Sequence, residues 1–193
     1  FGCFQTGYFY GKVFKGIDVR NYGSGNAGTT NTLRTLGKPA GYIVFLGDAL
    51  KAVFAVWIVR YLLFPGLGDV TKILETVTAL GVVFGHNYPF YMNFKGGKGI
   101  AATFGCFLGL LPHWTPLCVL AGIFIFFSCV VKINPNYYRT VATYILAAIC
   151  TVWLEPNRYI VFGFLLIAAS VLAKLFMSAE EKEHFEVKLA WKH

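Results

Sequence analysis

Continuous apolar runs, separated by short polar connections, are the main pattern along this chain. The runs do not alternate between apolar and polar positions as a half-buried strand would, so each favours a helix. In lipid, every backbone group must be hydrogen-bonded within its own segment, which also favours helices. About seven such segments follow one another, several of them short: 1–14, 41–64, 73–91, 100–111, 117–131, 141–153 and 159–177.

Composition places these helices in a membrane. Of the 193 residues, 56% are hydrophobic and only 13% are charged. A soluble domain of this length would need a larger share of charged residues to cover its surface. The sequence therefore predicts an all-α integral membrane protein with about seven transmembrane or part-membrane helices, folded as a single membrane domain over residues 1–193.

The two ends of the chain differ from the middle. Residues 1–14 are too few to cross the roughly 30 Å of hydrocarbon in a bilayer, so this first span is expected to be incomplete. No initiator methionine or basic segment precedes it, so it is not interpreted as a signal peptide. Residues 178–193 are polar with mixed charge and are expected to form a cytoplasmic tail.

The formal net charge of +8 comes from lysines and arginines that lie between the apolar segments rather than in one basic patch. When alternate connections are assigned to alternate sides of a membrane, most of these residues fall on one side, whereas Arg60, Lys72 and Arg158 fall on the other. Cytoplasmic loops are enriched in Lys and Arg, so the crowded side is expected to be cytoplasmic. The lipid bilayer is therefore the expected partner, and nucleic acid is not.

The first long polar connection contains the stretch "GSGNAGTTN". Its glycines can leave backbone amides bare, and the short polar side chains between them add donors. Such a loop leading into a helix, here 30–36, is typical of an anion site, and Arg34 offers a fork for phosphate oxygens one turn later. The candidate binding residues are Gly23, Ser24, Gly25, Asn26, Gly28, Thr30 and Asn31. A helix cap with a flexible loop is the alternative interpretation, and it stays open.

A nucleotide-binding P-loop is a further interpretation of the same stretch. Gly23 and Gly28 have the spacing of the two glycines in that motif, but Thr29 stands where its lysine is required. No strand–helix–strand pattern surrounds the loop. An ATPase or GTPase is therefore not favoured.

A second glycine-rich stretch, "FKGGKG", precedes a later apolar segment. Lys95 and Lys98 bracket Gly96 and Gly97, and Gly99 opens the next segment. Two cations, bare amides and a helix N-terminus would meet there, which predicts a second anion site. A lysine pair at a membrane boundary is the simpler alternative, but such a boundary does not require three glycines in four residues.

Several other polar residues are candidates on the same side. His86 is either a hydrogen-bonded structural residue or a base. Asp48 and Lys51 are three residues apart, hence on one helical face, and are expected to form a mutual pair that tethers the first cytoplasmic loop. Arg139 and Thr140 lie at the start of a later helix, where Thr140 is either part of the site or an N-cap.

Signatures of nucleophilic catalysis are missing from the sequence. There is no GxSxG, HExxH or Cys/His signature, and the HxxxxD box of other glycerolipid acyltransferases is also absent. No cluster of ligands suggests a metal, so neither a metal nor a cofactor is expected. Any chemistry is therefore expected to work by positioning and charge neutralisation.

In this order, the stretches "GxDxRNYGSGNAGTTNTLRTLGK", "DALK" and "GHNYPFYMNFKGGKGIAA" resemble the bacterial acyl-phosphate-dependent glycerol-3-phosphate acyltransferases, the PlsY family. The resemblance runs from about Gly2 to about Lys132. It implies a multi-pass enzyme of the bacterial inner membrane with seven helices and a cytoplasmic active site. This enzyme would move an acyl group from acyl-phosphate to the 1-position of glycerol 3-phosphate, giving lysophosphatidic acid and phosphate in phospholipid synthesis.

The resemblance also implies roles for individual residues. Ser24 and Arg34 match first-motif residues needed for activity, and Gly96 to Gly99 match a segment associated with glycerol 3-phosphate. Lys95 and Lys98 would then hold phosphate. The candidate catalytic residues are Ser24, Arg34, His86 and Lys98.

The last third of the chain departs from the family. The stretch "YYRTVAT" keeps hydroxyl groups but not the serines of the third motif. The family's basic end, with a His and an Asn three residues apart, has no counterpart, and His184 is not assigned to it. The alternative function is a small transporter or flippase for an organic phosphate, whose charges would line a path to the outer face.

Overall fold

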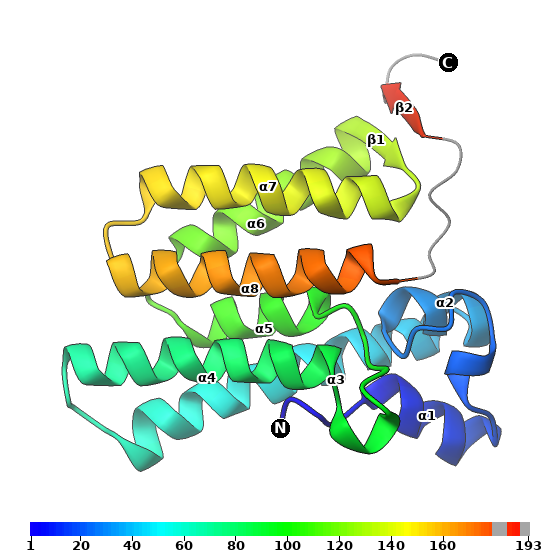
Figure 1. Cartoon of the computed structure of the whole chain (residues 1–193), viewed down its shortest axis with the longest axis horizontal. Helices are drawn as coiled ribbons and strands as arrows, with labels where there is room; N and C mark the ends of the chain where they lie inside the picture. Colours follow the sequence, from blue (N-terminus) through cyan, green and yellow to red (C-terminus); the bar gives the residue numbers. More distant parts are fainter. Residues whose placement is uncertain (179–184, 190–193) are drawn as a thin grey trace.

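The computed structural model describes residues 1–178 and 185–189, which fold mainly as a bundle of helices lying side by side (Figure 1). The α-helices are α1 (Thr6–Lys15), α2 (Thr29–Leu36), α3 (Lys38–Trp57), α4 (Asp69–Asn87), α5 (Ile100–Gly109), α6 (Thr115–Ile125), α7 (Asn136–Leu154) and α8 (Arg158–Phe176). The 3-10 turns are η1 (Val19–Asn21) and η3 (Phe90–Met92), and the π-helical turns are η2 (Ile58–Leu63) and η4 (Phe126–Val130). The strands are β1 (Val131–Asn134) and β2 (Glu186–Leu189).

The bundle is held together by apolar faces. Helix α3 packs against α5, and α4 packs against α8, as Figure 1 shows for the second pair. At the centre, the rings of Phe107 and Phe164 stack with centroids 5.0 Å apart. Small residues allow close approach of the helices, since a Cβ on Gly105 would overlap the backbone of Ala49 on α3. Lipid provides no hydrophobic driving force for helices to associate, so close van der Waals packing of this kind stabilises a bundle in a membrane.

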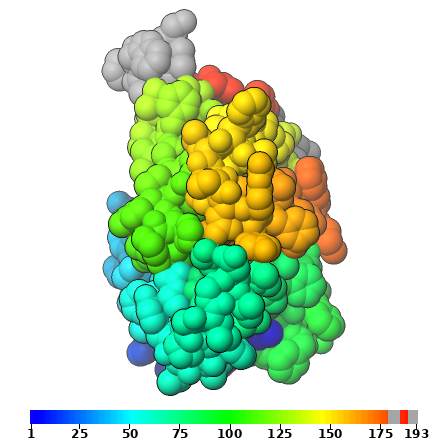
Figure 2. Space-filling model, turned by 90° about the vertical axis from the view of Figure 1, so that its left-hand side faces the viewer, coloured from blue at the N-terminus to red at the C-terminus, as the bar shows by residue number. Residues whose placement is uncertain are grey.

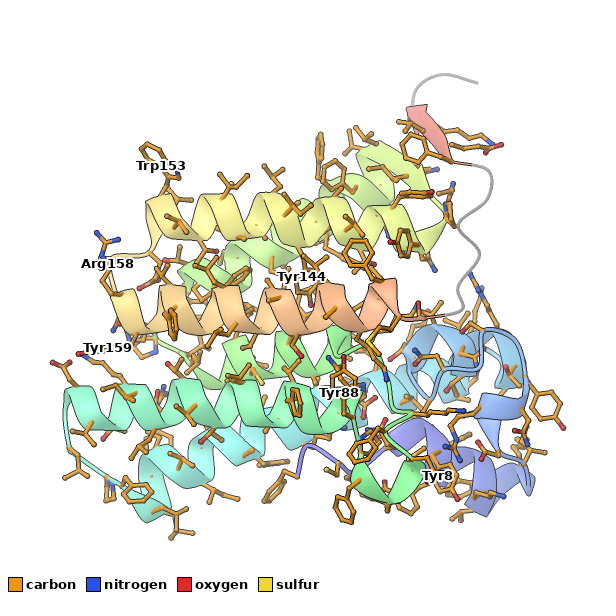
Figure 3. The ribbon with its side chains drawn as sticks, in the orientation of Figure 1. Tyr8, Tyr88, Tyr144, Trp153, Arg158 and Tyr159 are labelled. Atoms are coloured by element: carbon orange, nitrogen blue, oxygen red, sulfur yellow. The ribbon has the colours of Figure 1, made fainter. Side chains whose placement is uncertain are left out.

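Apolar side chains also cover much of the outside, as expected for helices that face lipid. Within the described part of the chain, two helical segments are long and apolar enough to cross a membrane, Lys38–Leu63 and Arg158–Phe176. Trp153 and Tyr159 gather at one end of the bundle, and Tyr8 and Tyr88 lie toward the other (Figure 3). Aromatic residues at both ends are typical of membrane interfaces. The expected count of about seven spanning or part-spanning helices stays a prediction.

A small sheet departs from the all-α prediction. Strand β1 pairs antiparallel with β2, with Val131 opposite Leu189 and Asn134 opposite Glu186. The Phe185 ring packs edge-on against Tyr138, with centroids 5.0 Å apart. Part of the predicted free tail is therefore a strand, because the backbone of β1 offers it hydrogen-bonding partners that a polar sequence pattern does not reveal. His184 lies outside the described residues.

The end of the bundle that carries the α3–α4, α5–α6 and α7–α8 connections is closed by a buried ion pair (Figure 2 shows this end). Arg60 donates to both carboxylate oxygens of Glu75, with N–O distances of 2.7 and 2.6 Å, and to the backbone oxygen of Leu111. Two parallel bonds make this a strong, directional contact. Arg60 thus ties η2, which follows α3 directly, to α4 and to the residues just after α5.

Glu75→Gln is expected to lower the free energy of unfolding by about 3 kcal/mol, because it leaves the buried Arg60 guanidinium without its counter-charge. Thermal unfolding of the detergent-solubilised protein measures this loss. Asp69→Asn is the matched control: it breaks an ion pair to Lys72 whose side chains are 70% and 40% exposed, and such pairs contribute less than about 1 kcal/mol. Equal losses in the two variants would contradict this assignment.

Candidate active site

A cavity of about 240 Å³ lies where the two glycine-rich stretches meet the helices. Its lining comes from segments far apart in the chain: Ser24, Asn26, Gly28, Thr29, Thr30, Asn31, Phe45, Asp48, His86, Lys98, Gly99, Ile100, Ala101, Phe104, Phe124, Asn136, Arg139 and Thr140. The two stretches lie against each other, because a Cβ on Gly28 would lie 3.9 Å from the Cα of Gly97. The two glycine-rich stretches therefore meet at one cavity.

Asn31 shapes the first glycine-rich loop. Its side-chain nitrogen donates to the backbone oxygens of Val19, Tyr22 and Asn26, at 2.8, 3.0 and 2.8 Å. Its oxygen accepts from the backbone nitrogen of Ser24 at 2.9 Å. All of these bonds are internal, so Asn31 shapes the loop. Asn31 also lines the cavity, and its role in phosphate binding stays a prediction.

Gly23 and Gly25 also contribute to the backbone conformation of the first glycine-rich loop. Both have left-handed backbone angles, with φ of +58° and +69°, which favour glycine. A Cβ on Gly23 would in addition overlap the side-chain oxygen of Asn31. Neither glycine is among the residues that line the cavity, and their role in phosphate binding stays a prediction.

The second glycine-rich loop is packed against the end of α4. The backbone nitrogens of Gly96 and Gly97 donate to the backbone oxygens of Asn87 and His86, at 3.3 and 3.0 Å. A Cβ on Gly97 would overlap the His86 ring, and one on Gly99, where φ is +82°, would lie 2.6 Å from the side-chain oxygen of Asn87. The prediction of bare amides at Gly96 and Gly97 is therefore wrong, since these glycines permit close packing instead.

Helix N-termini supply the amides that the glycines do not. Three helices begin at the cavity: α2 with Thr29 and Thr30, α5 with Ile100 and Ala101, and α7 with Asn136. The first N–H groups of an α-helix have no partner within the helix, and the helix dipole places partial positive charge there. Three such ends around one cavity favour an anion.

Two cationic side chains reinforce this preference. Lys98 and Arg139 are half-buried and line the cavity. The Arg139 guanidinium carbon lies 5.2 Å from the centre of the Phe124 ring, a cation–π contact that keeps the side chain on the cavity wall. The cavity thus combines positive charge with an apolar wall that includes Phe45 and Phe104.

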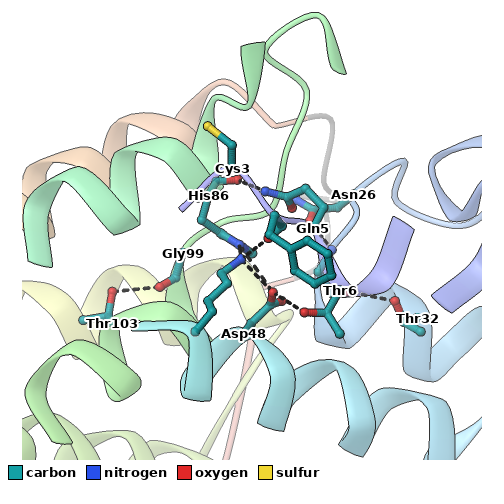
Figure 4. A network of polar contacts seen from close by, with 12 residues as sticks. Cys3, Gln5, Thr6, Asn26, Thr32, Asp48, His86, Gly99 and Thr103 are labelled. Carbon is teal, nitrogen blue, oxygen red and sulfur yellow. Dashed lines mark hydrogen bonds and ion pairs between the residues drawn. The ribbon is translucent and has the colours of Figure 1, made fainter. Parts of the chain in front are cut away.

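A buried polar network lies beneath the cavity (Figure 4). The ammonium of Lys51 lies 2.8 Å from Asp48 Oδ1 and 2.8 Å from His86 Nδ1, and it also donates to the backbone oxygen of Phe4. Thr6 donates to the same Asp48 oxygen at 2.9 Å. The predicted Asp48–Lys51 pair is confirmed, but it ties the start of α1 and His86 to α3, whereas a tether to the first cytoplasmic loop was expected.

Arg20 links the two loops from outside the cavity. It donates to the Asp18 carboxylate at 2.7 Å and to the backbone oxygen of Met92 at 3.3 Å, and it lies over the Tyr8 ring. Hydrogen bonding from this guanidinium lowers the pKa of the Asp18 carboxyl below its ordinary value. Arg20 therefore joins the first loop to the turn that precedes the second.

Comparison with known proteins identifies the fold and the motifs. The sequence model of the family described as glycerol-3-phosphate acyltransferase matches residues 1–182. The chain belongs to this family. The resemblance noted from the sequence is thus confirmed over most of the chain, including the part in which the motifs diverge.

Individual relatives of the family agree with this assignment. A glycerol-3-phosphate acyltransferase of Clostridioides difficile (strain 630) is 43% identical over 124 residues, which cover 64% of this chain and 60% of the relative. That of Staphylococcus haemolyticus (strain JCSC1435) is 37% identical over 175 residues, or 89% of this chain and 83% of the relative.

Two crystal structures of PlsY (YgiH), an integral membrane glycerol 3-phosphate acyltransferase, are also similar. The glycerol 3-phosphate form superposes with a TM-score of 0.67 at 29% identity, covering 90% of this chain and 84% of the PlsY chain. The lysophosphatidic acid form gives the same TM-score at 26% identity. The helical bundle is therefore that of an integral membrane acyltransferase family.

Within this family fold, some predicted residues lie outside the cavity. Arg34 and Lys95 are exposed and are not part of its lining. Arg34 follows Thr30 by four positions on α2 and therefore lies on the same helical face, one turn from the cavity. Both residues stay predictions as phosphate ligands.

Thr140 is buried and lies in the second turn of α7, where its hydroxyl donates to the backbone oxygen of Asn136 at 2.8 Å. The N-cap position belongs to Pro135, so the N-cap interpretation of Thr140 is wrong. Thr140 instead lines the cavity beside Arg139.

Sequence reasoning missed several residues of this acyltransferase fold. Phe45, Phe104 and Phe124 line the cavity, yet their spacing is the same as that of core or lipid-facing phenylalanines. Asn136 precedes the apolar segment 141–153 from which this helix was predicted, but it begins α7 at the cavity. In residues 1–178 and 185–189, no group of three or more His, Cys, Asp or Glu is arranged to hold a metal ion.

Proposed function

We propose that this chain transfers a fatty acyl group from acyl-phosphate to the 1-position of glycerol 3-phosphate, forming lysophosphatidic acid and inorganic phosphate. One observation carries the proposal. A single cavity combines three helix N-termini, Lys98 and Arg139 with the phenylalanine side chains of α3, α5 and α6. Both proposed substrates carry a phosphate and one carries a lipid chain, so an anion site bounded by apolar residues suits their meeting.

The proposed reaction is a direct displacement. The primary hydroxyl oxygen of glycerol 3-phosphate attacks the acyl carbonyl carbon, the bond from that carbon to the phosphate oxygen breaks, and phosphate leaves with the electron pair. A phosphate oxygen accepts the hydroxyl proton. The protein contributes by holding the two reactants together and by stabilising the charge that develops on the carbonyl and phosphate oxygens.

The polar side chains that line the cavity support this direct mechanism. Among the described residues that line the cavity, Asp48 is the sole carboxylate, and it is already paired with Lys51 and accepts from Thr6. Ser24, half-buried at the cavity wall, offers a hydroxyl that can donate to phosphate. We therefore assign Ser24, Lys98, Arg139 and the helix N-termini to phosphate binding.

The packed interior argues against the transporter or flippase alternative. Such a protein needs a polar path from the cavity to the opposite face. Between the cavity and the Arg60–Glu75 pair, the centre of the bundle is filled by apolar side chains that include Phe107, Leu110 and Phe164. With the basic residues crowded on the cavity side, we also propose that the site faces the cytoplasm, in the inner membrane of a bacterium.

Purified protein in detergent, incubated with palmitoyl-phosphate and glycerol 3-phosphate, is expected to release lysophosphatidic acid and phosphate in equal amounts. Mass spectrometry of the lipid product and a phosphate assay measure both. Palmitoyl-CoA in place of palmitoyl-phosphate is the control, and it is expected to give no product above background. Product from palmitoyl-CoA at a comparable rate would overturn the acyl-phosphate assignment, and no product from either donor would overturn the transferase proposal.

A further inference from the structure

The hydrogen bonds around His86 decide which ring nitrogen carries the proton. An ammonium has three N–H donors and no acceptor. Three acceptors surround Lys51 Nζ: the backbone oxygen of Phe4, Asp48 Oδ1 at 2.8 Å, and His86 Nδ1 at 2.8 Å. Because the first two can only accept, the three donors and three acceptors match when Nδ1 is the unprotonated nitrogen of the ring.

Charge supports the same assignment. Asp48 and Lys51 form an ion pair whose side chains are 1% and 6% exposed, so solvent does little to weaken their attraction. A positively charged imidazole beside this ammonium would place two like charges 2.8 Å apart. The ring is therefore neutral, with its proton on Nε2.

The protonated nitrogen is the one that the network leaves available. His86 lines the cavity together with Lys98 and Gly99, and because Nδ1 is engaged by Lys51, Nε2 is the ring nitrogen that can bind a ligand there. Gln5 fixes the backbone at the same point, since its side-chain nitrogen donates to the backbone oxygen of His86 at 2.8 Å. His86 is thus held at two points, its backbone oxygen and its ring atom Nδ1.

We infer that His86 acts as a hydrogen-bond donor, through Nε2–H, to a phosphate oxygen of a substrate in the cavity, and that Lys51 and Asp48 are positioning residues that set this tautomer. His86 is then not a general base, because the ring nitrogen that can bind a ligand already carries a proton and Nδ1 is occupied by Lys51. The inference rests on the proposed function for the identity of the phosphate, whereas the tautomer does not depend on it.

Nitrogen NMR of the detergent-solubilised protein, labelled with ¹⁵N-histidine, tests the tautomer without an activity measurement. The chain has four histidines, and the His86 signals are assigned as those that disappear in His86→Gln. Nδ1 is expected to resonate as an unprotonated nitrogen and Nε2 as a protonated one. Adding glycerol 3-phosphate is expected to shift the Nε2 signal. A proton on Nδ1, protons on both nitrogens, or no response of Nε2 to glycerol 3-phosphate would overturn the inference.

Lys51→Met tests the positioning role. Without the ammonium, the nearest partner of Nδ1 is Asp48 Oδ1, now 3.7 Å away, and a carboxylate can only accept. The proton is therefore expected to move to Nδ1, a change that a merely structural role of Lys51 would not produce. Retention of the wild-type tautomer in a folded Lys51→Met protein would overturn the role of Lys51.

Kinetic measurements distinguish whether His86 acts as a hydrogen-bond donor or as a general base. A glutamine side-chain nitrogen can replace Nε2, whereas an asparagine reaches only the position of Nδ1. His86→Gln is therefore expected to keep kcat/KM within about tenfold of the wild type, and His86→Asn to lose at least about tenfold more, as for a hydrogen bond to a charged group. Equal losses in the two variants would contradict the donor role. If NMR shows the expected His86 tautomer but neither the wild type nor any variant transfers acyl groups, the proposed function is wrong and the tautomer assignment remains valid.

Discussion

Gly97→Ala is expected to lower kcat/KM for acyl transfer by at least about 100-fold, the scale of loss when reacting groups are displaced by about an ångström. A Cβ at this position would overlap Nε2 of His86 and lie 2.7 Å from Cε1 of the same ring. The second loop or the ring must therefore shift, and either movement disturbs the cavity. The palmitoyl-phosphate assay measures the loss.

Gly81→Ala is the matched control for this substitution. Gly81 lies on α4, as His86 does, and no atom lies within 4 Å of a Cβ built there. Wild-type activity is expected, with a stability gain of about 0.5–1 kcal/mol, because alanine is the better helix former. Comparable activity losses in the two variants would show that the crowding at His86 is not the cause.

A double-substitution cycle tests the crowding itself. Gly97→Ala is expected to reduce the thermal stability of the wild-type protein. The same substitution is expected to cost much less in the His86→Ala protein, which lacks the imidazole ring. Unfolding in detergent measures both differences. Equal losses of stability in the two backgrounds would contradict the contact between Gly97 and the imidazole.

Lys98→Ala is expected to abolish acyl transfer, with a loss of at least about 100-fold in kcat/KM, because it removes a cation that stabilises phosphate and carbonyl charge in a partly enclosed site. Lys98 is half-buried at the cavity, at the point where α5 begins. Lys95→Ala is expected to lose less, because Lys95 is exposed and outside the cavity lining. The same assay, with each substrate varied in turn, measures these losses.

Lys72→Ala is the control for the change in charge. Lys72 is at the opposite end of the bundle, where it forms an exposed pair with Asp69. Wild-type activity is expected, since the lost charge is far from the cavity and screened by solvent. If a folded Lys98→Ala protein kept more than half of the wild-type activity, the assignment of Lys98 to the active site would be wrong.

The helices were largely predictable because lipid restricts the choices available to the chain. A run such as 159–177 must satisfy its own backbone groups, so its sequence alone indicates a helix, and α8 spans Arg158–Phe176. The sheet was not predictable in the same way. Strand β1 is four residues long, and its partner β2 lies 51 residues further on, so no local pattern marks the pairing.

Several polar residues of the cavity were predictable. Ser24, Lys98, Arg139 and Thr140 were assigned from local chemistry, and all four line the cavity. The phenylalanines on its wall were not, since an apolar side chain facing a cavity has the same sequence pattern as one facing the core. Only the packing of α3, α5 and α6 brings Phe45, Phe104 and Phe124 to one surface.

By itself, the sequence determined the membrane class, most of the helices and the position of the two glycine-rich stretches, because these depend on hydrophobicity, backbone freedom and charge within short segments. The tertiary structure decided what the glycines do: Gly96 and Gly97 let the second loop pack on α4, and the first residues of α2, α5 and α7 line the cavity. It also decided the state of His86, through contacts with Lys51 and Asp48 from another helix. The Lys51 contact joins residues 35 positions apart, and only the folded chain holds their atoms at hydrogen-bonding distance.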